Sequence, residues 1–456
     1  MERGRYSRRN QGVVVDLLVI FSLLISFGFP GQFTEIYGDS IKTLLEYVAF
    51  IVEIALLVFC SANKWQDIEL LRLERKYLPI YLYVAVNALT SLLVSFDRRQ
   101  ELITVIRWAV TMQFVLWMVD YFSREKLLEI FCTTQAIFLM LTLYFMIRHP
   151  NLAYSSASTY ENSLNGLFST KNTCATQLCF GITMMVLLIR LRYQQHKRFG
   201  MWTALLLTQV VLLFMCDATG ALFTQLFAFI PLFFLRRHKF SLGLLYITVN
   251  VVFLFAMLTL MPLFEEFLES IEKDATLTGR IPLWEQVISV MSTHNTLTGY
   301  GYCNFWRNDE AVKLIHMGFY RADVFMATMT SGAHNVIMEA WLNSGLIGIT
   351  VFFIALLMSF RDIDEMDDEY YAISACLIFF LMINGLTERC LGDNYDYRTV
   401  ALFLAMGVGC SKRPSMYSGI SWSEWFSRAQ KEVRPHTRRA IPWHFHCPPQ
   451  LEPLFS

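Results

Sequence analysis

Two residues in the C-terminal half combine a chemically useful side chain with a position at the edge of an apolar segment. Arg280 opens a predicted helix, and His334 precedes a long apolar run. A guanidinium at a helix N-terminus favours a phosphate or diphosphate, because the helix dipole adds to its charge. A histidine can be neutral at physiological pH and act as a general base. The alternatives are an arginine that anchors to lipid headgroups and a histidine that caps a helix or lies at the membrane interface.

Other polar residues lie at the ends of apolar runs, where they could join the same site. Glu339 lies about one turn beyond His334 and is the third candidate for a catalytic role. We expect the following residues to bind substrate: Asn335, Asp217, Lys171, Arg389, Arg398 and Arg107. Glu388 belongs to the same ring of polar groups. No Cys/His spacing is typical of a zinc site, so we expect neither a metal nor another cofactor.

The composition is that of a membrane protein. Of the 456 residues, 55% are hydrophobic and 17% are charged, whereas a soluble domain has about a quarter charged residues. The formal net charge is zero, and the basic residues cluster in short segments between apolar runs. We therefore expect the lipid bilayer as a partner and no nucleic acid.

About twelve apolar runs are long enough to cross a bilayer, whose core needs roughly 20 residues per helix. They lie at 13–29, 41–60, 78–95, 101–122, 127–148, 173–192, 201–217, 219–235, 241–261, 334–358, 371–387 and 397–411. The predicted fold class is all-α, a polytopic membrane protein with about twelve transmembrane helices. We expect nine spans in 1–261, a large extracytoplasmic loop at 262–333, three spans in 334–411 and a basic cytoplasmic tail at 412–456.

The positions of Lys and Arg predict the orientation, because these residues gather in cytoplasmic loops. With the N-terminus inside, the inner segments hold dense basic groups, for example at 72–76 and 190–198, and the outer segments hold fewer. The chain would then be a multi-pass protein of the cell membrane with both termini in the cytoplasm, and the 262–333 loop would face outward.

The predicted outer loop contains an amphipathic helix of its own. Its apolar residues recur at helical spacing, and Pro282 suits the first turn. The stripe consists of Ile281, Trp284, Val287, Ile288 and Met291. Because it is apolar on one side only, this helix should lie on the membrane surface or pack over the outer ends of the spans.

Charged residues within the predicted spans are costly in lipid and therefore need an explanation. Glu46 and Arg107 lie at similar depths below the outer face, so we expect them to pair. The pair could fix the packing of two helices or line a cavity, and the sequence leaves both open.

The order of these motifs resembles the O-antigen ligase and polymerase family. The resemblance covers roughly residues 165–400 and rests on GLFSTKN, DATGAL, LTGR, LTGYGYCNFW and AHNVIMEAWLNSGLIG. It implies a metal-independent membrane glycosyltransferase that uses an undecaprenyl-diphosphate-linked oligosaccharide at the outer face of the membrane. It also implies that Arg280 binds the donor diphosphate and that His334 assists the acceptor. A flippase and a chain-length regulator are further candidate partners.

One departure from the family pattern concerns the second cation of the diphosphate site. Many relatives have a Ser-Arg pair in the turn between two spans, where this chain has Asp217-Ala218-Thr219-Gly220. The second cation must then come from Arg389, Arg398 or Lys171, or the site is less cationic than usual.

Three functions are compatible with the sequence. The first is a polymerase of surface polysaccharide, of the O-antigen, capsule or exopolysaccharide kind, and the second is a ligase that moves finished glycan to a different acceptor. A flippase would also have about twelve spans, but such transporters usually have short loops and internal repeats. The long 262–333 loop and the lack of an evident repeat favour an enzyme.

Overall fold

The computed structural model describes residues 2–29, 31–62, 75–94, 97–155, 162–234, 241–270, 280–293, 295–302, 304–307, 312–315, 332–361, 366–388 and 396–410. They belong to one compact unit, residues 1–415. The predicted basic tail at 412–456 lies outside the described residues. The described residues are almost all helical and contain no strand.

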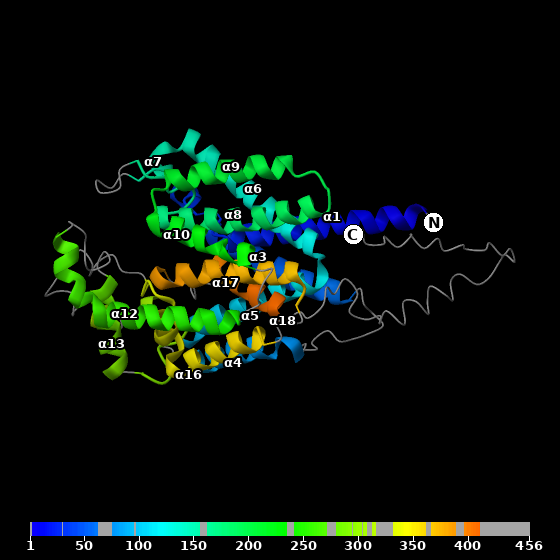
Figure 1. Cartoon of the computed structure of the whole chain (residues 1–456). Coiled ribbons are helices and arrows are strands. Elements are labelled where there is room, and N and C mark those ends of the chain that lie inside the picture. Colours follow the sequence, from blue (N-terminus) through cyan, green and yellow to red (C-terminus); the bar gives the residue numbers. More distant parts are fainter. Residues whose placement is uncertain are drawn as a thin grey trace, which may run out of the picture. The chain divides into compact units, whose positions relative to one another are not determined.

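Long helices lie at every apolar run predicted to cross the membrane (Figure 1). They are α1 (Glu2–Ser26), α3 (Asp39–Ala62), α4 (Leu78–Val94), α5 (Arg98–Tyr121), α6 (Arg124–Arg148), α8 (Lys171–Gln194), α9 (Gly200–Met215), α10 (Thr219–Ala228) with α11 (Ile230–Phe234), α12 (Leu242–Ser270), α16 (Val336–Ser359), α17 (Asp368–Thr387) and α18 (Tyr397–Cys410). Shorter elements are α2 (Phe33–Tyr37), α7 (Pro150–Ala153), α13 (Arg280–Thr293) and the 3₁₀ turns Arg75–Tyr77 and Phe305–Arg307.

Six of the described helices are long and apolar enough to cross a membrane, namely α5, α6, α8, the first part of α12, α16 and α17. The other helices at predicted spans are shorter, or, like α3, carry several charged residues. An all-helical membrane architecture is therefore confirmed, whereas the number of crossings stays a prediction.

Helices α8 and α17 form the centre of the bundle. In each of them 83% of the most apolar stretch is buried within the protein. Helix α17 packs against α18, α10, α12 and α8, and α16 packs along α4 and α12. Since a helix buried on all sides needs apolar residues all round, α8 and α17 lack a polar stripe. Their charged residues lie near their ends.

Side-chain caps fix where two of these helices begin. The Thr170 hydroxyl accepts the backbone N–H of Thr173 (3.3 Å) at the start of α8. The Asn335 amide oxygen accepts the N–H groups of Ile337 (2.9 Å) and Met338 (3.2 Å) at the start of α16. These caps satisfy N–H groups that have no partner within the helix.

Helix α16 is broken at Gly345. This glycine has φ +64°, and a loop segment packs there. Backbone bonds join Tyr300 N to Leu342 O (2.8 Å) and Leu346 N to Thr296 O (3.0 Å). The glycine is needed because a Cβ at 345 would lie 2.2 Å from the carbonyl carbon of Leu297.

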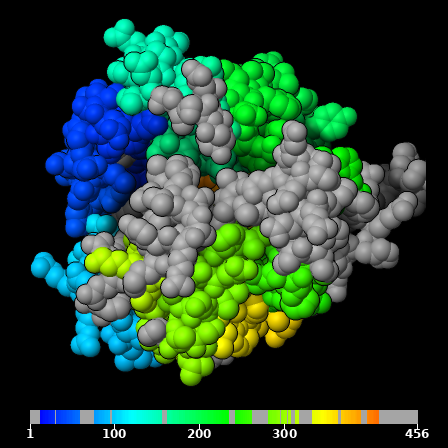
Figure 2. Space-filling model, turned by 90° about the vertical axis from the view of Figure 1, so that its left-hand side faces the viewer, coloured from blue at the N-terminus to red at the C-terminus, as the bar shows by residue number. Residues whose placement is uncertain are grey.

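The first part of the segment predicted as a loop at 262–333 is helical. Helix α12 continues to Ser270, beyond the drop in hydropathy at Glu265 and Glu266. Glutamate favours helix, so the end of an apolar run need not be the end of the helix. Within the described part of the loop, α13 buries Leu283, Trp284 and Val287 and packs against α16 and α12. Of the two predicted placements, packing over the helix ends is the one observed, and Figure 2 views the molecule from this end.

Candidate functional site

The ends of several helices surround a cavity of about 480 Å³. It lies where α8 and α10 begin and where α9 and α17 end, beside the start of α13. Its lining is mostly polar and consists of Ser155, Asn165, Ser169, Thr170, Lys171, Asn172, Thr176, Asp217, Ala218, Thr219, Gly220, Ala221, Arg280, Asn384, Thr387 and Glu388. Three of the residues predicted to form the site therefore share one cavity: Lys171, Asp217 and Arg280.

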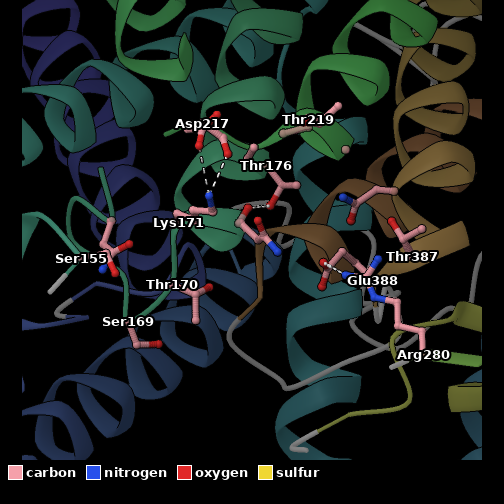
Figure 3. Close-up of a pocket in the computed structure, with 16 residues that line it drawn as sticks. Ser155, Ser169, Thr170, Lys171, Thr176, Asp217, Thr219, Arg280, Thr387 and Glu388 are labelled. Atoms are coloured by element: carbon pink, nitrogen blue, oxygen red, sulfur yellow. Dashed lines mark hydrogen bonds and ion pairs between the residues drawn. The ribbon is translucent and has the colours of Figure 1, made fainter. Parts of the chain in front are cut away.

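Arg280 and His334 are joined through one carboxylate, that of Glu388. Arg280 Nη2 donates to Glu388 Oε1 (3.0 Å), and His334 Nδ1 lies 3.4 Å from Glu388 Oε2 (Figure 3 draws the arginine contact). The arginine and glutamate side chains are only 20% and 16% exposed, whereas His334 is 35% exposed. The cation and the candidate base thus lie on either side of a single acid.

The pKa of Glu388 is lowered from its usual value of 4.5 by its cationic neighbours. Burial is the largest effect and acts in the opposite direction, because it disfavours the charged form. The hydrogen bond and charge of His334, followed by the charges of Arg280 and Arg398, outweigh it. Glu388 is therefore ionised at neutral pH and acts as the counter-ion of this side of the cavity.

A second ion pair lies elsewhere on the cavity wall. Lys171 Nζ donates to the backbone oxygen of Asp217 (2.9 Å) and lies 3.5 Å from its carboxylate, as Figure 3 shows. Asp217 has φ +50° in the turn between α9 and α10, and its side chain is 83% exposed. Because that carboxylate is well solvated, it neutralises Lys171 only weakly. Lys171 therefore presents a positive charge to the cavity.

Ala333, the residue before His334, makes buried hydrogen bonds through both its C=O and its N–H groups. Trp284 Nε1, on the same helix as Arg280, donates to Ala333 O (2.8 Å). Ala333 N donates to Glu339 Oε2 (2.8 Å), while Trp306 Nε1 donates to both carboxylate oxygens, Oε1 at 3.1 Å and Oε2 at 3.3 Å. His334 has φ +50°, so its backbone needs this support. Glu339 thus holds the backbone next to His334, and it is not among the residues that line the cavity.

Asn335 also has a positioning contact. It is fully buried, and besides capping α16 its Nδ2 donates to Leu386 O (3.2 Å), two residues before Glu388. The start of α16 is thereby tied to the end of α17. This contact fixes the location of His334 relative to Glu388.

Two other predicted residues that the structure describes, Arg398 and Arg107, do not line the cavity. Arg398 is 7% exposed and makes a two-pronged ion pair with Asp396, with Nη2–Oδ2 at 2.6 Å. Arg107 pairs with Glu46 at 3.8 Å, as predicted, and stacks over the Tyr47 ring. Arg389 lies outside the described residues.

Sequence reasoning placed Glu388 among the outer polar groups but gave it no function. Its only signal was an acidic residue directly after an apolar run. Along the sequence, Arg280 is 108 residues from Glu388 and His334 is 54 residues from it. Such a convergence is visible only in the folded chain.

A family model described as O-antigen ligase matches residues 203–353. This segment is therefore similar to the O-antigen ligase family. The match confirms the resemblance on which the sequence prediction relied. The matched segment contains the cavity residues Asp217 and Arg280 as well as His334, while the cavity residues Lys171 and Glu388 lie outside it. No curated protein matches the chain.

The family supports an integral membrane enzyme of the glycosyltransferase type that acts on lipid-linked sugars. It supports a ligase- or polymerase-type function and a part in polysaccharide biosynthesis. The geometry agrees with this chemistry, because the two cavity cations stand where helices end, which is where the charged head of a lipid would lie.

Proposed function

We propose that the chain is a surface polysaccharide polymerase. It transfers glycan from an undecaprenyl-diphosphate donor to a sugar hydroxyl of a lipid-linked repeat unit, at the outer face of the cytoplasmic membrane. The observation that carries this proposal is the shared cavity of Lys171 and Arg280, with the His334 base one side chain away from Arg280.

The second cation of the diphosphate site is then Lys171. Arg398, the other described candidate, is buried and already grips Asp396 with two nitrogens, so its release would leave a buried carboxylate without its partner. Lys171 lines the cavity and faces a carboxylate that is 83% exposed, which water can solvate when the lysine turns to a phosphate.

The proposed reaction is an inverting displacement at the anomeric carbon of the donor. The acceptor hydroxyl oxygen forms the new bond to this carbon as the bond from the carbon to the diphosphate oxygen breaks. The hydroxyl proton passes to the free ring nitrogen of His334. The bonding electrons leave with the diphosphate, whose added negative charge Arg280 and Lys171 stabilise.

A ligase is the second candidate, because the matched family model is described as O-antigen ligase. Both enzymes use the same donor chemistry and differ in the acceptor. Purified protein supplied only with lipid-linked repeat units should build a ladder of products if it is a polymerase. Transfer that occurs only when a different glycolipid acceptor is added would identify a ligase.

The chemical proposal is tested by His334→Ala in cells that make the polysaccharide. We expect chain elongation to stop and single lipid-linked repeats to accumulate on the outer face. Repeats that accumulate on the inner face would instead indicate a flippase. Arg280→Lys is the companion variant, because a point charge cannot reproduce a two-pronged grip on phosphate. A fully active lysine variant would contradict the diphosphate role.

We further propose that all twelve predicted spans cross the membrane and that the cavity opens outward. Two exposed positions test this orientation: Leu297, in the segment that packs on α16, and Tyr193, near the opposite end of α8 from Lys171. Single cysteines placed there should react differently with an impermeant thiol reagent added to intact cells. Leu297→Cys should be labelled and Tyr193→Cys should not, and the reverse pattern would place the cavity in the cytoplasm.

A further inference from the structure

Glu388 uses its two oxygens for two different partners. Oε1 accepts from Arg280 at 3.0 Å, and Oε2 faces His334 Nδ1 at 3.4 Å. In this structure the acid is therefore shared between the residue proposed to bind the donor and the residue proposed to activate the acceptor. A diphosphate that binds Arg280 must compete with this carboxylate.

The two contacts differ in how firmly the chain holds them. Asn335, adjacent to His334, donates to Leu386 O (3.2 Å), and Glu388 N donates to Asn384 O (2.9 Å). These bonds keep Glu388 beside His334 whatever happens in the cavity. Arg280 comes from α13, a separate helix, and reaches Glu388 only through its long side chain. When the contacts are disturbed, Arg280 is the partner that leaves.

Building on the proposed function, we propose that Glu388 is a positioning residue that changes partner when the donor binds. The donor diphosphate takes Arg280 away from Glu388. The carboxylate then remains as the counter-ion of His334 alone. Donor binding and activation of the base are thereby coupled through one side chain.

The chemical consequence concerns the basicity of His334. With its proton on Nδ1 the ring donates to Glu388, and Nε2 is left with the lone pair that accepts the acceptor's proton. While Arg280 shares the acid, it offsets part of the negative charge that would stabilise the imidazolium. Once Arg280 has moved to the diphosphate, Glu388 stabilises the charged ring fully. The base is therefore strongest when a donor is in place.

Among the described residues, the charged groups that act on Glu388 are His334, Arg280 and Arg398. Arg398 is held by Asp396 in its own ion pair. Removal of the Glu388 charge should therefore affect donor binding through Arg280 and the base through His334.

The deciding experiment measures binding and turnover of Glu388→Gln in the full-length protein in lipid nanodiscs. We expect undecaprenyl diphosphate to bind about tenfold more tightly, because its competitor for Arg280 has lost its charge. We expect kcat to fall at least about tenfold, with a lower pKa on the acid side of the kcat profile. A purely structural role would weaken binding and turnover together, and unchanged or weaker binding would refute the exchange.

Two further variants separate this inference from the proposed function. Arg280→Ala should weaken undecaprenyl diphosphate binding, and if it does not, the donor site itself is wrongly assigned. If Arg280→Ala weakens binding but Glu388→Gln does not tighten it, only the exchange fails. Asp217→Asn removes the same charge from the cavity wall beside Lys171, so it should leave the acid-side pKa of kcat in place.

A folding defect in Glu388→Gln would not leave the question open. Glu388→Asp keeps the charge but shortens the side chain, which loosens both contacts. It should shift binding and kcat in the same directions as Glu388→Gln and by smaller factors. Changes of the opposite sign in a folded Glu388→Asp protein would overturn the proposal.

Discussion

Replacement of Glu339 by glutamine distinguishes a catalytic from a positioning function. Glu339 is 2% exposed, and its two oxygens accept from Ala333 N (2.8 Å) and Trp306 Nε1 (3.1 Å). Trp306 Nε1 donates to both oxygens of Glu339 (3.1 and 3.3 Å), so a glutamine, which has one oxygen, leaves either Ala333 N or one branch of the Trp306 hydrogen bond facing an amide NH₂ group. Leaving a buried donor without an acceptor costs about 1 to 3 kcal/mol. We expect the free energy of unfolding to fall by about this amount.

The effect on activity should follow from the displacement of His334. Ala333 directly precedes this residue, so a shift of its peptide moves the base relative to the acceptor. A misplacement of about 1 Å can reduce turnover by about a hundredfold. We expect kcat of Glu339→Gln, measured by formation of the product ladder, to fall between tenfold and a hundredfold. Donor binding should change little.

A matched second variant makes the test decisive. Trp306→Phe removes the second donor, so that the single oxygen of a glutamine at 339 can serve Ala333 alone. The double variant should therefore recover both stability and kcat relative to Glu339→Gln. If Glu339 were the general base, glutamine would abolish turnover without lowering the thermal unfolding midpoint, and Trp306→Phe would rescue nothing. That outcome would refute the positioning function.

Three other predictions follow from single contacts. Gly345→Ala should lower the thermal unfolding midpoint, because its φ of +64° and the 2.2 Å approach to Leu297 exclude a Cβ; Gly220→Ala, with open space around it, is the control. Lys171→Met should weaken undecaprenyl diphosphate binding by about tenfold, and Lys171→Arg should restore it; equal binding by all three proteins would exclude Lys171 from the donor site. The lowered pKa of Glu388 stabilises the fold above its usual value of 4.5, and this stabilisation is lost as the pH falls through the folded-state pKa. The difference in unfolding midpoint between wild type and Glu388→Gln should therefore shrink below about pH 4.5.

Much of the local structure follows from the sequence. Apolar runs placed helices at each predicted span, and the Pro282 signal and apolar stripe placed α13 with its start at Arg280. The intramembrane pairing of Glu46 with Arg107 was also predicted, since two opposite charges at one depth in lipid stabilise each other. Helix ends defined by polarity alone were less accurate, as the extension of α12 to Ser270 shows.

The functions of Glu339 and Asn335 could not be read from their position in the sequence. Asn335 adjoins His334 and Glu339 lies about one turn beyond it, which suggested substrate binding for Asn335 and a catalytic role for Glu339. The structure directs Glu339 to the Ala333 peptide and Trp306, and Asn335 to the cap of α16 and to Leu386. Sequence neighbours on a helix point in different directions, so proximity along the chain does not predict a shared cavity.

The sequence by itself determined which residues stand at the ends of helices, because helix formation and burial depend on local composition and periodicity. This placed Arg280, His334 and Lys171 at the start of predicted helices. Only the tertiary structure decided which of these ends meet. The packing of α17 against α8, α10 and α12 brings Glu388 to Arg280 and His334 and gives Lys171 and Arg280 one cavity, because contacts between distant segments are set by the whole core.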